Sequence, residues 1–183
     1  MIEQVFSNFK KEYDHILDSF YPSLGSTGFQ EKNLTTNFAK AYEKTFNEDD
    51  IVVWFELQFG EQKNNHFDCL IINKNKQHIY LIESKRFVSA DAKKNSIQKD
   101  IERINNYVSV GFKKDERFKK FKNYKVFGLI LADVWEESDA KIKVFEGFNN
   151  KTIFGTGEYH AIDFEVEECE AKYGLLAYLW ETK

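Results

Sequence analysis

The spacing of hydrophobic positions divides the first third of the chain into two helices and one strand. Near the N-terminus, hydrophobic residues recur every three or four positions, which predicts an amphipathic helix over residues 3–20. Pro22 and two glycines interrupt this pattern, and a second helical pattern predicts a helix over residues 30–46. The β-branched and aromatic run from Ile51 to Phe59 then predicts a strand.

Two further apolar runs predict a β-hairpin followed by a long helix. The runs cover residues 67–72 and 78–85, and the polar segment 73–77 joins them as a turn. Apolar residues at helical spacing then predict a helix that begins near Ser89 and ends near Val108. Its expected inward positions are Ile97, Ile101, Ile104 and Val108, and its expected outward positions are Lys94, Asp100 and Glu102.

The second half of the chain predicts more strands. Residues 124–132 are so apolar that they fit a strand buried on both faces, and the long helical connection before them favours parallel pairing with the preceding strand. Residues 141–146 and 161–166 predict strands, whereas residues 173–180 fit either a strand or a helix. This order predicts the α/β class, with a central mixed sheet flanked by helices.

Composition indicates one folded, soluble domain over residues 1–183. The chain is 42% hydrophobic and 16% aromatic, enough to build a dense core. Its N-terminus lacks a signal-peptide pattern and no window is long and apolar enough for a membrane span, so we expect a cytoplasmic protein without a membrane partner. Cys69 and Cys169 lie a hundred residues apart and belong to no metal-binding motif, which argues against structural zinc or disulfides.

The charges are unevenly distributed along the chain. The net charge is −4, but residues 85–125 carry thirteen Lys or Arg against five Asp or Glu, and residues 133–170 carry three against eleven. A locally basic region attracts a polyanion whatever the total charge, so the net negative charge does not exclude nucleic acid as a partner. The basic run 113–122 taken by itself is more typical of a solvated helix or loop.

A small group of polar residues stands at the open end of the predicted hairpin. Strand alternation places Glu83 and Lys85 on one face, and the hairpin brings Asp68 to them, with His66 on the same side. Charges at the end of a buried strand need a partner, and a divalent cation supplies one. Two structural alternatives are an exposed cross-strand charge network and, for His66, a structural hydrogen bond instead of a contact with phosphate or water.

These residues and the order of elements around them resemble the PD-(D/E)XK nuclease superfamily, which has the restriction-endonuclease-like fold. The core of that family is a helix, a meander of three strands, a crossover helix and a fourth strand. The resemblance covers about residues 30–132, leaving an N-terminal helix and an acidic C-terminal extension of about residues 133–183 with added strands. Phe67 stands where the family motif has proline.

The resemblance implies a role for each residue of this group. Asp68 and Glu83 would bind Mg²⁺ or Mn²⁺ together with the backbone carbonyl of Ser84. Lys85 would orient or help to deprotonate the attacking water and balance charge on the phosphate. Glu31 would complete the metal shell, although a glutamate at a helix start is equally well explained by the helix dipole. Glu43 and Glu56 rank below Glu31 as alternatives.

The crossover helix contributes further candidates under the same resemblance. Gln98 occupies the place of a polar residue that faces the site, although its position beside Ile97 also fits solvent exposure. Several basic residues could follow a nucleic-acid backbone or simply be solvated: Lys93, Lys94, Lys99 and Arg103.

We therefore expect a Mg-dependent endonuclease that hydrolyses phosphodiester bonds in nucleic acid, with DNA as the substrate that the family implies. Cutting both strands of a duplex would favour a homodimer. The alternative is a non-catalytic module that retains the fold and binds nucleic acid or a protein. A third hypothesis is that surface aromatics, including Trp135 and Trp180, mediate assembly.

Overall fold

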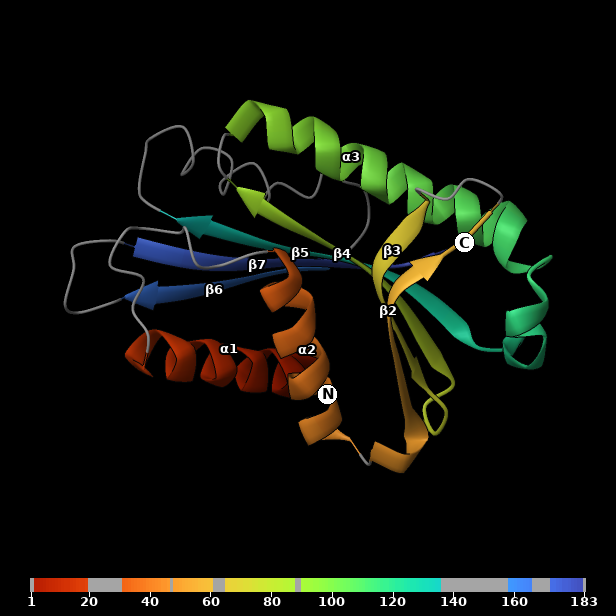
Figure 1. Ribbon diagram of the computed structural model, residues 1–183, viewed down its shortest axis with the longest axis horizontal. Coiled ribbons are helices and arrows are strands. Elements are labelled where there is room, and N and C mark those ends of the chain that lie inside the picture. The colour runs from red at the N-terminus through yellow and green to blue at the C-terminus, as the bar shows by residue number, and fades with distance from the viewer. Residues whose placement is uncertain are drawn as a thin grey trace.

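The computed structural model describes residues 2–19, 31–46, 48–60, 65–87, 90–135, 158–165 and 172–182. In this part of the chain, helices flank both faces of one six-stranded mixed sheet, so the predicted α/β class is confirmed (Figure 1). The main elements are α1 (Ile2–Ser19), α2 (Glu31–Thr45), β2 (Ile51–Gln58), β3 (His66–Asn73), β4 (His78–Phe87), α3 (Ala90–Asn106), β5 (Lys125–Trp135), β6 (Glu158–Glu165) and β7 (Lys172–Glu181).

The sheet has the strand order β2-β3-β4-β5-β7-β6. Strands β3 and β4 form the predicted antiparallel hairpin. Strand β5 pairs parallel to β4 after the α3 crossover, which confirms the expectation drawn from the long helical connection. The other neighbouring strands pair antiparallel.

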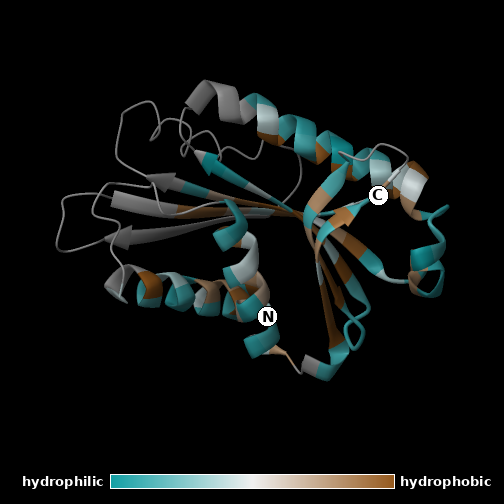
Figure 2. Cartoon of the chain, viewed as in Figure 1, coloured by the Kyte–Doolittle hydropathy of each residue, from teal (hydrophilic) through white to brown (hydrophobic). Residues whose placement is uncertain are grey.

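Two hydrophobic clusters fill the spaces between the sheet and its helices. Strand alternation sends Leu70 and Ile72 toward α3, whereas Cys69 and Ile71 face α1 and α2. Brown hydrophobic positions are concentrated in the central strands, and α3 carries many teal positions (Figure 2). All four inward positions expected on the predicted helix are buried: Ile97, Ile101 and Ile104 in α3, and Val108 just after its end.

The segment at 173–180, which fitted either a strand or a helix, forms part of strand β7 between β5 and β6. Trp180 in this strand is 8% exposed, and its Nε1 donates a hydrogen bond to Asn105 Oδ1 at 2.9 Å. The hypothesis that Trp180 belongs to an assembly surface is therefore wrong. The Trp135 side chain and the predicted strand at 141–146 lie outside the described residues.

Two short helices connect α3 to β5. A π-helix, Tyr107–Phe112, continues α3, and a 3₁₀ helix, Glu116–Phe121, follows it. The basic run 113–122 lies across this connection with its lysines exposed. Among the described helices, none has the length and apolarity needed to cross a membrane.

Candidate functional site

Strand β4 extends past the end of its pairing with β3. The β3–β4 ladder ends at Cys69 opposite Ile82, but β4 continues to Phe87 and stays paired with β5 on its other side. From Glu83 onward, β4 therefore presents backbone groups on the side facing β3 that no strand among the described residues receives. We call this stretch, residues 83–87 on the side facing β3, the open edge.

Two carboxylates take the place of the missing strand at the open edge. The Ser84 N–H donates to Asp68 Oδ2 at 2.7 Å, and the Arg86 N–H donates to Glu31 Oε1 at 2.9 Å. Residues two apart in a strand direct their N–H groups to the same side, so Asp68 and Glu31 lie along one line on β4. Both bonds involve a charged acceptor, which makes them stronger than neutral ones.

The Asp68 carboxyl lies in a partly buried, negatively charged environment. Burial raises its pKa above the ordinary value, and the Glu31 and Glu56 carboxylates raise it further, while the Ser84 N–H and Lys85 act in the opposite direction. Its second oxygen, Oδ1, makes no hydrogen bond within the described part of the chain. That oxygen is available to a cation.

Glu83 points to the opposite face of β4 from Ser84 and meets α3. Its Oε1 lies 2.6 Å from Arg103 Nη2, and its Oε2 lies 3.8 Å from Lys85 Nζ. Asp100 contacts the same two cations, with Oδ1 at 2.8 Å from Arg103 Nη2 and Oδ2 at 2.9 Å from Lys85 Nζ. These four side chains, which we call the charge ring, form a closed circuit of alternating sign.

The protonation of the charge ring follows from its burial. Burial raises the pKa of Glu83 to about 8 and the Asp68 carboxylate adds to the rise, so these two effects outweigh Arg103 and Lys85. Burial alone would lower the pKa of Lys85, but the Asp100 and Glu83 carboxylates raise it above its ordinary value. Lys85 is therefore a stable ammonium group at neutral pH.

Several buried polar atoms of this region lack a hydrogen bond of good geometry among the described residues. They are Glu83 Oε1, Ser84 Oγ, Asp100 Oδ2 and Arg103 Nε. The Glu83–Arg103 and Asp100–Lys85 contacts are thus charge contacts that are not aligned as hydrogen bonds. Buried atoms in this state are costly, and a bound ion or ordered water would satisfy them.

A second group of side chains approaches Asp68 from β2. The register passes from Phe55 opposite Cys69 to Leu57 opposite Phe67, and Glu56 between them has a left-handed backbone with φ 54°. Leu57 and Phe67 consequently pack on the α3 side, which simple alternation would not give. The ladder is locally broken at Glu56.

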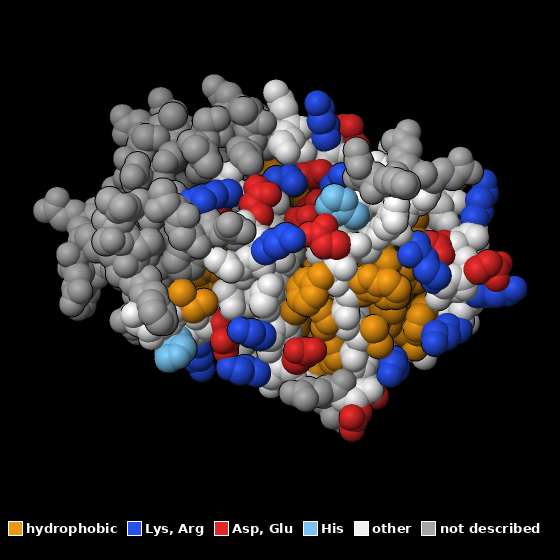
Figure 3. All heavy atoms as spheres, in the orientation of Figure 1, with side chains coloured by type: hydrophobic (Ala, Val, Ile, Leu, Met, Phe, Trp, Pro, Cys, Tyr) orange, Lys and Arg blue, Asp and Glu red, His pale blue; other side chains and the backbone are white. Residues whose placement is uncertain are grey.

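This break places the Glu56 carboxylate beside His66. Glu56 Oε2 lies 2.9 Å from His66 Nε2, and Glu56 Oε1 lies 3.4 Å from Lys32 Nζ. Potential metal-ligating atoms of Glu56, His66 and Asp68 all lie within 4.8 Å of one another. On the face shown in Figure 3, acidic side chains gather beside a histidine with basic side chains around them. The sequence ranked Glu56 low because a residue within this strand could point to either face. A left-handed backbone inside a strand has no local sequence signal that would have settled the direction.

The structure therefore places Asp68 and Glu31 at the open edge of β4 and places Glu83 and Lys85, from the same strand, in the charge ring, but it keeps Gln98 out of both. Gln98 is exposed and its Nε2 donates to Glu102 Oε1 at 3.0 Å. The outward position expected for Asp100 is wrong, because Asp100 is buried in the charge ring. Its spacing could have indicated this, since a residue three after Ile97 and four before Ile104 shares their face.

The basic residues expected along α3 fall into three situations. Arg103 belongs to the charge ring, whereas Lys99 is exposed one turn earlier. Lys93 and Lys94 lie within α3, but their side chains are outside the described residues.

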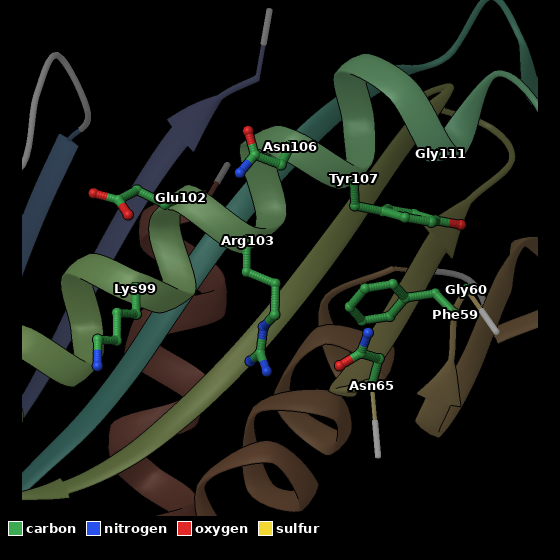
Figure 4. A pocket seen from close by; sticks show the side chains of 9 residues that line it. All are labelled: Phe59, Gly60, Asn65, Lys99, Glu102, Arg103, Asn106, Tyr107 and Gly111. Atoms are coloured by element: carbon green, nitrogen blue, oxygen red, sulfur yellow. The ribbon is translucent and has the colours of Figure 1, made fainter. Parts of the chain in front are cut away.

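An open cleft adjoins the charge ring between α3 and the segment that joins β2 to β3. It has a volume of about 490 Å³, and we call it the α3 cleft. Arg103 and Lys99 line it from the helix, while Phe59 and Asn65 approach from the opposite side, as Figure 4 shows. Arg103 therefore links the charge ring to a space that a ligand can enter.

Comparison of the chain with protein-family models, curated proteins and solved structures finds no match.

Proposed function

We propose that this protein is a divalent-cation-dependent nuclease that hydrolyses phosphodiester bonds in nucleic acid, with DNA as the substrate. The observation that carries the proposal is that β4 binds the Asp68 and Glu31 carboxylates at its open edge and carries Glu83 and Lys85 in the adjoining charge ring. The order α2–β2–β3–β4–α3–β5 also agrees with the core of the PD-(D/E)XK nucleases, which the sequence resembles.

The residues at the open edge suit a hard divalent cation. Asp68 Oδ1 and Glu83 Oε1 are carboxylate oxygens without an aligned hydrogen bond among the described residues. The Ser84 carbonyl points to the same side of the strand as the N–H that Asp68 binds, so it offers a third oxygen. Oxygen ligands of this kind are preferred by Mg²⁺ and Mn²⁺. Glu31 stands next to them along β4.

A divalent cation in this position would polarise the scissile phosphodiester and lower the pKa of a bound water. Lys85 contributes positive charge beside the reacting phosphate. Because its pKa is raised, Lys85 is better suited to stabilising negative charge and orienting water than to removing a proton. Asp100 holds the Lys85 ammonium at 2.9 Å and thereby fixes its position.

One observation favours the alternative of a non-catalytic module that binds nucleic acid or a protein. In the charge ring, Glu83 and Asp100 each contact both Lys85 and Arg103, so both carboxyl groups have basic partners without a divalent cation. In such a module the ring would be a structural device that joins β4 to α3. The two proposals differ in whether the protein binds a divalent cation and turns over a substrate.

A cleavage assay separates the two functions. Wild-type protein, Asp68→Asn and Lys85→Met would be incubated with Mg²⁺ or Mn²⁺ and with single-stranded, duplex and branched DNA, and with RNA. Asp68→Asn removes a cation ligand and should reduce the cleavage rate by more than about a hundredfold. Asp14→Asn is the matched control, because Asp14 is an α1 surface residue paired with Lys10. Equal cleavage by all four proteins, or cleavage that persists in excess EDTA, would contradict the nuclease proposal.

A further inference from the structure

Arg103 occupies a position beside the Glu83 carboxylate that a bound divalent cation would also occupy. Its Nη2 lies 2.6 Å from Glu83 Oε1, the same oxygen that is buried without an aligned hydrogen bond. The contact is therefore a charge contact and not the two-point fork that Arg and carboxylate form at their best. A divalent cation at Glu83 would compete with Arg103 for that oxygen and would also repel the guanidinium.

Arg103 has a second anchor that would remain if it left Glu83. It bonds to Asp100 Oδ1 at 2.8 Å, and Asp100 lies three residues earlier on the same helix. The Arg103 side chain is 33% exposed and lines the α3 cleft. A small rotation about Asp100 would therefore turn the guanidinium from the charge ring into the cleft.

The α3 cleft offers an anionic ligand a suitable environment. Lys99 adds a second positive charge one turn from Arg103, and Asn65 and Asn106 add amide donors. Glu102 is its one acidic lining residue among those described. A phosphodiester group is the ligand that an arginine, a lysine and neutral donors recognise together.

We propose that Arg103 is a phosphate-binding residue that Glu83 holds back until a divalent cation binds. The cation takes over Glu83, and Arg103 turns into the α3 cleft to bind a phosphate of the nucleic acid. Cation and nucleic acid then bind with positive coupling. This inference rests on the cation site of the proposed function and adds a positioning role for Glu83 and a binding role for Arg103.

The coupling is measured as the affinity for a fluorescein-labelled single-stranded oligonucleotide with and without Ca²⁺. Ca²⁺ shares the preference for oxygen ligands, and the oligonucleotide is checked for cleavage on a gel after each titration. For the wild type, we expect Ca²⁺ to tighten binding by about fivefold or more, which is the usual range of coupling between sites. In Arg103→Met, which keeps the aliphatic stem without the charge, the gain should fall below about twofold.

Lys99→Met is the matched control for Arg103→Met. Lys99 lines the same cleft but has no ion-pair partner among the described residues. Its loss should weaken oligonucleotide binding equally with and without Ca²⁺, so the ratio of the two affinities should match the wild type. If Arg103→Met also keeps the wild-type ratio, the cation acts by neutralising carboxylates in general, and the proposal is overturned.

Two further measurements do not depend on oligonucleotide binding. In calorimetric titrations, Arg103→Met should bind Ca²⁺ at least as tightly as the wild type, because a competitor for Glu83 is gone; weaker binding would contradict the exchange. In the wild-type protein, the ¹⁵N–¹H signal of Arg103 Nε, assigned with Arg103→Lys, should shift when Ca²⁺ is added. An unchanged signal would overturn the proposal even if Arg103→Met failed to fold.

The outcome also distinguishes this inference from the proposed function. A wild-type protein that binds no divalent cation and cleaves nothing removes both. A wild-type protein that binds cations and cleaves nucleic acid, with an Arg103→Met variant of unchanged coupling, removes only the role of Arg103.

Discussion

At the scale of single residues, Glu83 is the group on which the site depends. Its side chain is 2% exposed, lies next to a second carboxylate, Asp68, and contacts Arg103 and Lys85. The positive charges of Arg103 and Lys85 do not compensate for burial and for the neighbouring negative charge, so the pKa of Glu83 rises to about 8. Without a divalent cation the folded protein therefore holds a proton on Glu83 up to a higher pH than the unfolded chain does.

This raised pKa predicts that the stability of the cation-free protein depends on pH. The folded state holds a proton that the unfolded state releases near the ordinary value of 4.5, so the stabilisation is full below that pH and is lost as pH rises through about 8. In EDTA, the free energy of unfolding in urea should fall by on the order of a few kcal/mol between pH 5 and 9.

Glu83→Gln tests whether this residue is the source, because the amide keeps the shape and cannot titrate. The variant should have a clearly flatter pH dependence than the wild type, with a remainder of the same sign from Asp68, whose pKa is also raised. Adding Mg²⁺ at pH 8 to 9 should stabilise the wild type more than the variant. A variant with the same slope as the wild type would place the titrating group elsewhere.

At the scale of elements, the break between β2 and β3 shapes one side of the site. Glu56 adopts φ 54°, a conformation that costs a residue with a side chain about 1–2 kcal/mol. It turns the carboxylate toward His66 and Asp68 and directs Leu57 into the core on the α3 side. Strain of this size persists where the surrounding structure enforces it, and such positions concentrate at functional sites.

This conformation predicts an unusual order of stability for variants at position 56. Glycine adopts positive φ without strain, so Glu56→Gly should be more stable than Glu56→Ala by about 1–2 kcal/mol in urea unfolding. Both variants lose the carboxylate, so the comparison isolates the backbone. At Gln58 in the same strand, whose φ is not positive, the glycine variant should be the less stable one. The same order at both positions would argue against the left-handed Glu56.

At the scale of the whole molecule, the end of the chain is part of the central sheet. Strand β7 lies between β5 and β6, and Leu175, Leu176 and Ala177 are buried in the two cores. Trp180 stands opposite Gly128 of β5, where any Cβ would overlap its ring, and also bonds to Asn105 of α3. Strand β4, which carries Glu83 and Lys85, pairs with β5, and β5 in turn pairs with β7.

Trp180→Ala should therefore destabilise the entire domain. Removing a buried tryptophan leaves a cavity over Gly128, so we expect a loss of about 3–5 kcal/mol in the free energy of unfolding. Trp54→Ala is the matched control, because Trp54 is 51% exposed on the edge strand β2, and its replacement should change stability by less than about 1 kcal/mol. Equal losses in the two variants would contradict the buried role of Trp180.

Local sequence patterns were enough to predict most of the elements and the face that Glu83 and Lys85 share on β4. Periodicity depends on local geometry, so it correctly predicted α3, the β3–β4 hairpin and the common face of Glu83 and Lys85. The approach of Asp68 to the end of β4 followed from the hairpin in the same way. These predictions needed only the periodicity of side chains along helices and strands and the length of the hairpin turn.

Packing between elements distant in sequence sets which other residues meet this strand. Asp100 and Arg103 enter the site because α3 packs against β4, and Glu31 enters because α2 crosses the opposite face. The left-handed Glu56 and the strand identity of residues 173–180 likewise depend on neighbours that are distant in sequence. Local propensity contains no information about such neighbours, since their effect arises from burial and charge after the chain has folded.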